Sequence, residues 1–236
     1  MNNILIFVSM SPRSPPTLED SLREMFPEEW LRQTSKETGL IIRERKIDPV
    51  IIFWVLTLSF GVRLQRTLAS LKREYETESH KTISDSSWYY RFTPELVEFL
   101  HQCVIHGIEE LAKESGRKLS KKLENFQDIV IQDSTIVRLH SSLADKFPAA
   151  RARTVAAVVK VGVMVSAVAN GPKTVALYSE KTAEIKTLKI GPLIKVETKN
   201  VQVIEALIWT AILTLIVGRR IYTLVRNSTT HPEKNG

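Results

Sequence analysis

The sequence predicts an α+β protein, with helices in its first half, a short mixed sheet after residue 126 and a long helix near its C-terminus. The β-branched run Ile129–Ile131 favours a buried strand, and Asp133 is predicted to lie where that strand ends. Residues 160–169 and 174–179 favour two antiparallel strands, because the Asn170-Gly171 pair between them supplies the positive φ of a tight turn. Residues 199–226 form a nearly continuous apolar stretch that predicts the long helix.

The chain divides into three predicted parts. Residues 1–16 are predicted to be a disordered leader, because Pro12, Arg13, Pro15 and Pro16 keep it extended. Its apolar residues 4–8 are too few for a membrane span, and no basic residue precedes them as in a secretory signal. A helical domain is expected over residues 17–125, and a second domain with the sheet over residues 126–236.

Local signals define the expected helices of the first domain. Thr17, with Asp20 three residues later, has the spacing of an N-terminal cap, and Pro27 restarts a second short helix that Gly39 ends. Asp48 followed by proline predicts the start of a buried helix over residues 50–60. Residues 62–78 repeat apolar side chains at helical spacing, and a cap at Thr93 opens a long helix to Gly116.

The segment 84–92 is aromatic and carries Arg91. The order of predicted elements here is a helix, a turn, a short aromatic helix and a long helix. This order is compatible with a helix-turn-helix DNA module, although helical hairpins with aromatic cores are more common. The nearby His101, Cys103 and His106 suggest a metal site. Residues 101 and 106 lie about 140° apart on a helix, so they do not converge on one ion, and ordinary packing is the better interpretation.

Charge is uneven along the chain. Residues 1–125 carry 18 basic and 18 acidic side chains, and residues 126–236 carry 15 and 8, which places the whole net charge of +7 in the second part. This asymmetry favours a polyanion such as DNA as the partner, with a solvated basic face as the alternative. The single cysteine, Cys103, excludes an intrachain disulfide and fits the reducing cytoplasm.

The apolar run from Val201 to Val217 is long enough to raise the question of a membrane span. Glu205 near its start and the Arg219-Arg220 pair at its end are compatible with a span. We favour a core helix packed on the sheet over a membrane-anchored basic protein, and expect no membrane partner.

Residues 131–192, which begin IQDSTIVRLH and end EIKTLKIGP, resemble the start of the catalytic domain of archaeal transposases of the insertion-sequence-4 family. The resemblance extends upstream through residues 48–76 and 84–113, and residues 199–227 resemble the end of such proteins. It implies a ribonuclease H-like core that binds transposon ends and cleaves DNA with two Mg²⁺ ions held by an Asp-Asp-Glu triad. Asp133 matches the first catalytic, metal-binding Asp.

The other two carboxylates of that triad have no match. No Asp follows Asp145, and from the end of the hairpin through the C-terminal helix none of the glutamates, Glu180, Glu184, Glu197 and Glu205, has the Tyr and Arg spacing of the family's third residue. Asp128 precedes Asp133 by five residues, so a strand places it on the opposite face, roughly 16 Å away. The chain is therefore expected to be an internally deleted copy with a truncated core and impaired Mg²⁺ binding.

These observations predict a DNA transposase by resemblance, in a catalytically incomplete form. The alternative is a non-catalytic DNA-binding protein that represses related active transposases. DNA is the expected partner, with no small-molecule substrate and a possible homodimer. The basic residues expected to contact DNA are Arg91, Arg138, Lys146, Arg151 and Arg153.

Overall fold

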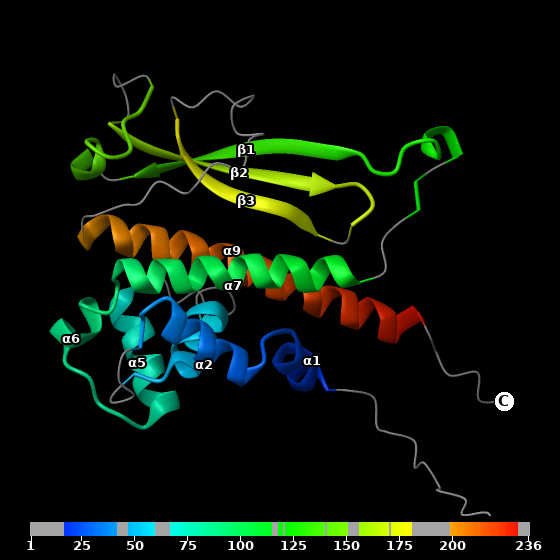
Figure 1. The fold of residues 1–236 in the computed structure, drawn as a ribbon. Helices are drawn as coiled ribbons and strands as arrows, with labels where there is room; N and C mark the ends of the chain where they lie inside the picture. Colours follow the sequence, from blue (N-terminus) through cyan, green and yellow to red (C-terminus); the bar gives the residue numbers. More distant parts are fainter. Residues whose placement is uncertain are drawn as a thin grey trace, which may run out of the picture.

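The computed structural model describes residues 17–41, 47–59, 67–114, 118–119, 121–139, 141–150, 156–169, 171–180 and 199–230. The predicted leader, residues 1–16, lies outside them. A small sheet lies over one side of a pair of long helices, α7 and α9, and the shorter N-terminal helices lie on the other side of that pair (Figure 1). Helices together with a small antiparallel sheet agree with the predicted α+β class.

The first two helices begin and end close to where the sequence predicts. α1 spans Leu18–Met25 and opens with a capping box, in which Thr17 Oγ1 accepts from the Asp20 N–H at 3.1 Å and Asp20 accepts from the Thr17 N–H at 3.0 Å. α2 spans Glu28–Glu37 directly after Pro27. Gly39 follows with φ of 77°, a left-handed conformation that favours glycine and ends the helix.

The buried helix predicted after Asp48 has two parts. α3 spans Pro49–Trp54, and the Asp48 carboxylate caps it by accepting from the Val50 N–H at 2.8 Å. It continues as a π-helical turn, η1, over Val55–Ser59. The wider turn leaves the Thr57 carbonyl able to accept from Thr214 Oγ1 of α9 at 2.8 Å.

Three more helices complete the first part of the chain. α5 spans Leu68–Ser79, α6 spans Asp85–Tyr89 and α7 spans Pro94–Lys113, with Thr93 as the N-terminal cap of α7. Trp88 of α6 is buried, and its indole N–H donates to the Leu68 carbonyl at 2.9 Å. A short 3₁₀ turn, η2, follows at Lys121–Leu123.

The sheet has three strands in the order β1-β2-β3, namely Val130–Leu139, Ala157–Ser166 and Pro172–Ser179. A 3₁₀ turn, η3, lies between the first two strands at Ser141–Leu143. Both pairings are antiparallel, so the prediction of a mixed sheet was wrong for the described strands. The physical reason is connectivity, because a parallel pair needs a longer crossover and these strands follow each other through turns and one loop.

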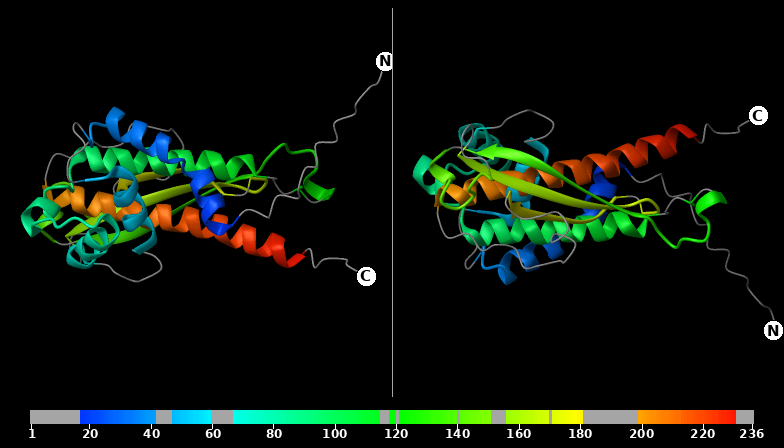
Figure 2. Two further views of the ribbon diagram at one scale, coloured as in Figure 1. Left: turned by 90° about the horizontal axis from the view of Figure 1, so that it is seen from below. Right: turned by 90° about the horizontal axis from the view of Figure 1, so that it is seen from above.

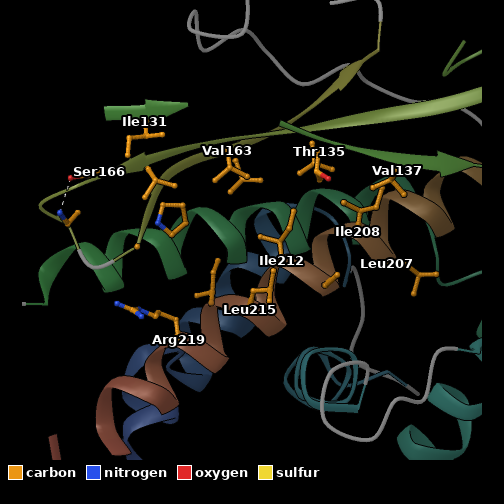
Figure 3. A pocket seen from close by; sticks show the side chains of 18 of the residues that line it. Ile131, Thr135, Val137, Val163, Ser166, Leu207, Ile208, Ile212, Leu215 and Arg219 are labelled. Carbon is orange, nitrogen blue, oxygen red and sulfur yellow. Dashed lines mark hydrogen bonds between the residues drawn. The ribbon is translucent and has the colours of Figure 1, made fainter. Parts of the chain in front are cut away.

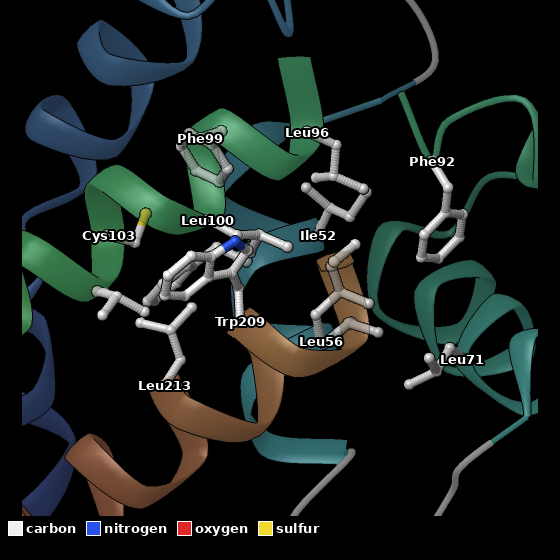
Figure 4. Close-up of a cluster of buried hydrophobic side chains, with 14 of the residues drawn as sticks. Ile52, Leu56, Leu71, Phe92, Leu96, Phe99, Leu100, Cys103, Trp209 and Leu213 are labelled. Carbon is white, nitrogen blue, oxygen red and sulfur yellow. The ribbon is translucent and has the colours of Figure 1, made fainter. Parts of the chain in front are cut away.

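Helix α9 spans Lys199–Thr230 and confirms the long C-terminal helix. It packs along α7 and against η1, and its Trp209 is buried among Phe99, Leu100 and Cys103 of α7 (Figure 4). Arg220 of α9 also pairs with Glu114, with 2.6 Å between Nη1 and Oε1. One buried cluster includes residues from before and after residue 125. The division into two domains stays a prediction, and the two stretches share a core.

Candidate functional site

Asp133 lies within strand β1, where it is the fourth of ten residues and stands opposite Val163 of β2. The prediction that it ends the strand was therefore wrong. Thr135, Ile136 and Val137 follow it, and these β-branched residues continue the extended backbone past the polar Asp-Ser pair. The Asp133 side chain is exposed, and its Oδ1 accepts from the Ser134 backbone N–H at 2.7 Å.

The register places Asp133 on the face of the sheet that is turned toward the helices. Directly opposed residues of an antiparallel pair share a face, and Val163 lines the space between the sheet and α9. Asp128 lies two residues before β1, and its predicted separation from Asp133 stays a prediction. Its carboxylate accepts from Ser166 Oγ at 2.7 Å and forms an ion pair with Lys173 at 2.7 Å. The Lys173 and Ser166 contacts lower the pKa of Asp128 to about 2.

The other candidate carboxylates do not gather around Asp133. Glu180 accepts from the Ala150 N–H at 2.6 Å, and Asp145 is exposed in the loop between β1 and β2. Glu184 and Glu197 lie outside the described residues. Within the described part of the chain, no group of three or more His, Cys, Asp or Glu side chains could hold a metal ion. Among the described residues the donor set does not fit a two-ion Mg²⁺ site, because one exposed carboxylate supplies too few oxygens.

Glu205 is the carboxylate with the most unusual surroundings. It lies in the first part of α9, only 7% exposed, and burial raises its pKa to about 7 while the nearby Lys146 lowers it. The sequence named both residues but did not relate them. Lys146, predicted to contact DNA, is half-buried and lies near Glu205 on the helix side of the sheet.

The remaining predicted DNA-binding residues are spread over the molecule. Arg138 is exposed near the end of β1, and its even number places it on the outer face of the sheet, away from the helices. Lys160 of β2 shares that face but is buried, with Ile136 and Tyr178 as its neighbours in register. Sequence reasoning did not name Lys160 as a site residue. The alternation of side chains along the predicted strands could have placed it on the same face as Arg138. Arg151 and Arg153 lie outside the described residues.

Arg91 follows α6 and is half-buried. Of the aromatic residues around it, Trp88 and Phe92 belong to the core, whereas Tyr89 and Tyr90 are exposed and their rings meet edge to face at 6.2 Å. The exposed part of this segment is thus the pair Tyr89 and Tyr90, which with the half-buried Arg91 forms a Tyr-Tyr-Arg tip before α7. The aromatic core is compatible with both a helix-turn-helix module and an ordinary helical hairpin.

The histidines beside Cys103 have structural surroundings, in agreement with the sequence interpretation. His106 stacks on Trp30 at 4.0 Å between ring centroids, and its Nε2 lies 2.9 Å from the Met25 carbonyl oxygen. His101 lies against Trp209 instead, at 4.7 Å. Burial raises the pKa of the Cys103 thiol, which therefore stays protonated.

An apolar groove of about 960 Å³ separates the inner face of the sheet from α9 (Figure 3). Ile131, Thr135 and Val137 of β1 line one wall, and Ile208, Ile212 and Leu215 of α9 line the other. The expectation that α9 packs closely on the sheet is therefore only partly met, because α9 packs mainly on α7.

Helix α9 also contains a stretch, Val201–Arg226, that is long and apolar enough to cross a membrane by length and composition. Half of its most apolar window is buried inside the protein. A core helix of a folded protein has the same properties.

No family model, curated protein or solved structure matches the chain.

Proposed function

We propose that this protein binds DNA as an internally deleted, cytoplasmic relative of insertion-sequence-4 transposases that lacks the carboxylates for strand cleavage. The resemblance of residues 131–192 to the start of a transposase catalytic domain supports the family. A sheet of three antiparallel strands in chain order is compatible with the beginning of a ribonuclease H-like core. A non-catalytic role, such as repression of active relatives at shared DNA sites, follows from the same features.

The observation that carries DNA binding is the position of the charge. All of the net charge of +7 belongs to residues 126–236, and Arg138 presents its side chain on the face of the sheet that is turned away from the described helices. On that face Arg138 is exposed, whereas Val158 opposite it and Lys160 are buried. Basic side chains on such a face neutralise phosphates and release counterions, so the affinity falls with salt.

Binding of a fluorescent 30-base-pair duplex, followed by anisotropy at increasing salt, tests this proposal. Affinity should fall by about tenfold or more between roughly 50 and 200 mM salt. Arg138→Glu should weaken binding and reduce the salt slope by about 1. The matched control is Arg23→Glu, which reverses one exposed charge in α1, where Arg23 forms an ion pair with Glu19.

Two results would reject the proposal: binding that does not depend on salt, and equal weakening by Arg23→Glu and Arg138→Glu. Arg91→Ala separates the two candidate DNA surfaces. If the Tyr-Tyr-Arg tip contacts DNA, this variant binds less tightly than the wild type, and if the sheet face alone contacts DNA, the two bind equally.

A further inference from the structure

Two threonine hydroxyls lie in the protein interior where α9 packs against the π-helical turn η1. Thr57 of η1 and Thr210 of α9 are both 0% exposed. The hydroxyl oxygen of each is buried and has no hydrogen-bond partner in the described part of the chain. A buried hydroxyl without a partner loses its hydration and gains nothing in return, so such groups are rare in folded proteins and commonly mark a buried water.

A third threonine, Thr214, shows that Thr57 and Thr210 are close neighbours. Its hydroxyl lies 2.8 Å from the Thr57 carbonyl oxygen and 3.0 Å from the Thr210 carbonyl oxygen. Both carbonyls therefore meet at one hydroxyl, and each belongs to a residue whose own hydroxyl is unpaired. Thr210 and Thr214 also share one face of α9, because they are four residues apart. The unpaired hydroxyls are thus gathered at the contact between η1 and α9.

The π-helical turn interrupts the regular packing at this contact. It spans Val55–Ser59, with Thr57 as its middle residue. Such turns widen a helix locally and are frequent at functional sites. Both views in Figure 2 show the orange N-terminal half of α9, which contains Thr210, within the body of the protein, while the red C-terminal half extends away from it. The contact with η1 is therefore internal.

The surroundings of the two hydroxyls favour a small, neutral ligand. Leu56 and Trp209, which precede Thr57 and Thr210 in sequence, belong to the buried apolar cluster (Figure 4). The polar groups identified at the contact are hydroxyls and carbonyls, which carry no net charge. A cation would lose its hydration here without a carboxylate in compensation, whereas a water molecule needs only two to four polar partners.

We propose that Thr57 and Thr210 bind one buried water molecule between η1 and α9. Each hydroxyl can donate to the water or accept from it, and the carbonyl oxygens of the same two residues have second lone pairs for its protons. The water extends the direct contact of Thr214 into a polar junction that holds α9 in place along η1. This inference does not depend on DNA binding.

A high-resolution crystal structure of the full chain tests the site directly. Electron density for one water molecule is expected within hydrogen-bond distance of both the Thr57 and the Thr210 hydroxyl. Hydroxyls that instead contact protein atoms, or that have no density between them, would overturn the proposal. Density with the several short oxygen contacts of a metal ion would also overturn it.

Valine variants test the same site in solution, because valine keeps the shape of threonine and removes the hydroxyl. Thr57→Val and Thr210→Val should each raise the equilibrium constant of unfolding by about fivefold to thirtyfold, since each leaves the water with one partner fewer. The double variant should lose less stability than the two single losses combined, because both act through the same water. Urea unfolding of the full chain measures all three.

The matched control is Thr223→Val in the same helix. The Thr223 hydroxyl is half-buried and donates to the Arg219 carbonyl at 3.1 Å, within α9 itself. This variant should change the equilibrium constant of unfolding by about twofold at most.

Two results of the unfolding experiment would overturn the proposal. A Thr57→Val or Thr210→Val protein that is more stable than the wild type shows a hydroxyl buried without any partner, because valine then removes a desolvation cost. Losses that add fully in the double variant show that the two hydroxyls do not share a water. If a valine variant does not fold, the crystal structure of the wild type decides the proposal on its own.

Discussion

Lys173, at the start of β3, places its ammonium 2.7 Å from the carboxylate of Asp128, immediately before β1. This ion pair connects the two outer strands of the sheet across the end of β2, where Ser166 also donates to Asp128 at 2.7 Å. The lowered pKa of Asp128 means that the folded state favours the ionised carboxylate.

Acid should therefore weaken the sheet through Asp128. With a folded pKa of about 2 and an unfolded value near 3.9, the contribution is fully present above about pH 4 and is lost as the pH falls through about 2. Thermal unfolding between pH 2 and pH 6 should show a smaller acid-induced loss of stability in Asp128→Asn than in the wild type. Lys173→Met should resemble Asp128→Asn. If both variants lose as much thermal stability in acid as the wild type does, the prediction is contradicted.

Glu205 should have the opposite effect on stability. Its folded pKa of about 7 lies above the ordinary value of 4.5, so the folded state binds a proton that the unfolded state releases. The stabilisation of the folded state by protonated Glu205 is complete below about pH 4.5. It declines as the pH rises to about 7 and does not change above that. The change corresponds to about 3 kcal/mol in the free energy of unfolding.

Glu205→Gln tests this directly, because a neutral amide of nearly the same shape removes the titration. Urea unfolding at pH 5 and pH 8 should show a smaller difference for the variant than for the wild type. Lys146→Met should enlarge the difference, since it removes the cation that lowers the pKa of Glu205. A wild type whose stability changes between pH 5 and pH 8 by no more than that of Glu205→Gln would contradict the assignment.

Two glycines offer a matched test of the α7–α9 contact. A Cβ added at Gly107 of α7 would lie 2.9 Å from Ile216 Cγ2 of α9 and 3.0 Å from Phe26, so Gly107→Ala should destabilise the protein by about 1–3 kcal/mol. At Gly218 of α9 a Cβ would meet nothing within 4 Å among the described residues. Gly218→Ala should therefore stabilise the helix by about 0.5–1 kcal/mol. Chemical denaturation measures both, and two changes of the same sign would show that α9 is placed differently.

The helices could be predicted well because their signals are local. The Thr17 and Asp20 capping box, the Asp48 cap and the Thr93 cap each act within one turn, so the sequence alone indicates where α1, α3 and α7 begin. The hairpin of β2 and β3 was also predicted, because the turn and the alternation lie within one segment.

The position of Asp133 within its strand was not predictable in the same way. An Asp-Ser pair is a frequent strand end, and only pairing with Val163 and Gly162 of β2 carries the strand past it. The short distance between Lys146 and Glu205 also depends on how the loop after β1 packs against α9. A local sequence pattern does not predict such a contact. The groove likewise results from the tilt between α9 and the sheet, a tertiary property.

Strand cleavage should be absent, and the reason is the number of available ligands. Two ions of charge +2 held a few ångströms apart repel each other, and each needs several carboxylate oxygens. In the described part of the chain Asp133 is an exposed carboxylate in the middle of β1, and no cluster of acidic or histidine side chains surrounds it. A second identical subunit adds only a second copy of the same incomplete set.

The measurement is nicking of a supercoiled plasmid that carries the DNA flanking this chain's own gene, in Mg²⁺ and in Mn²⁺. The wild type should convert no more plasmid to the open circle than Asp133→Ala does. The matched control is Asp145→Ala, which removes an exposed carboxylate from the loop after β1. Site-specific nicking that persists in Asp145→Ala and disappears in Asp133→Ala would falsify the proposed loss of catalysis. The missing ligands would then have to be sought at Glu184 and Glu197, which lie outside the described residues.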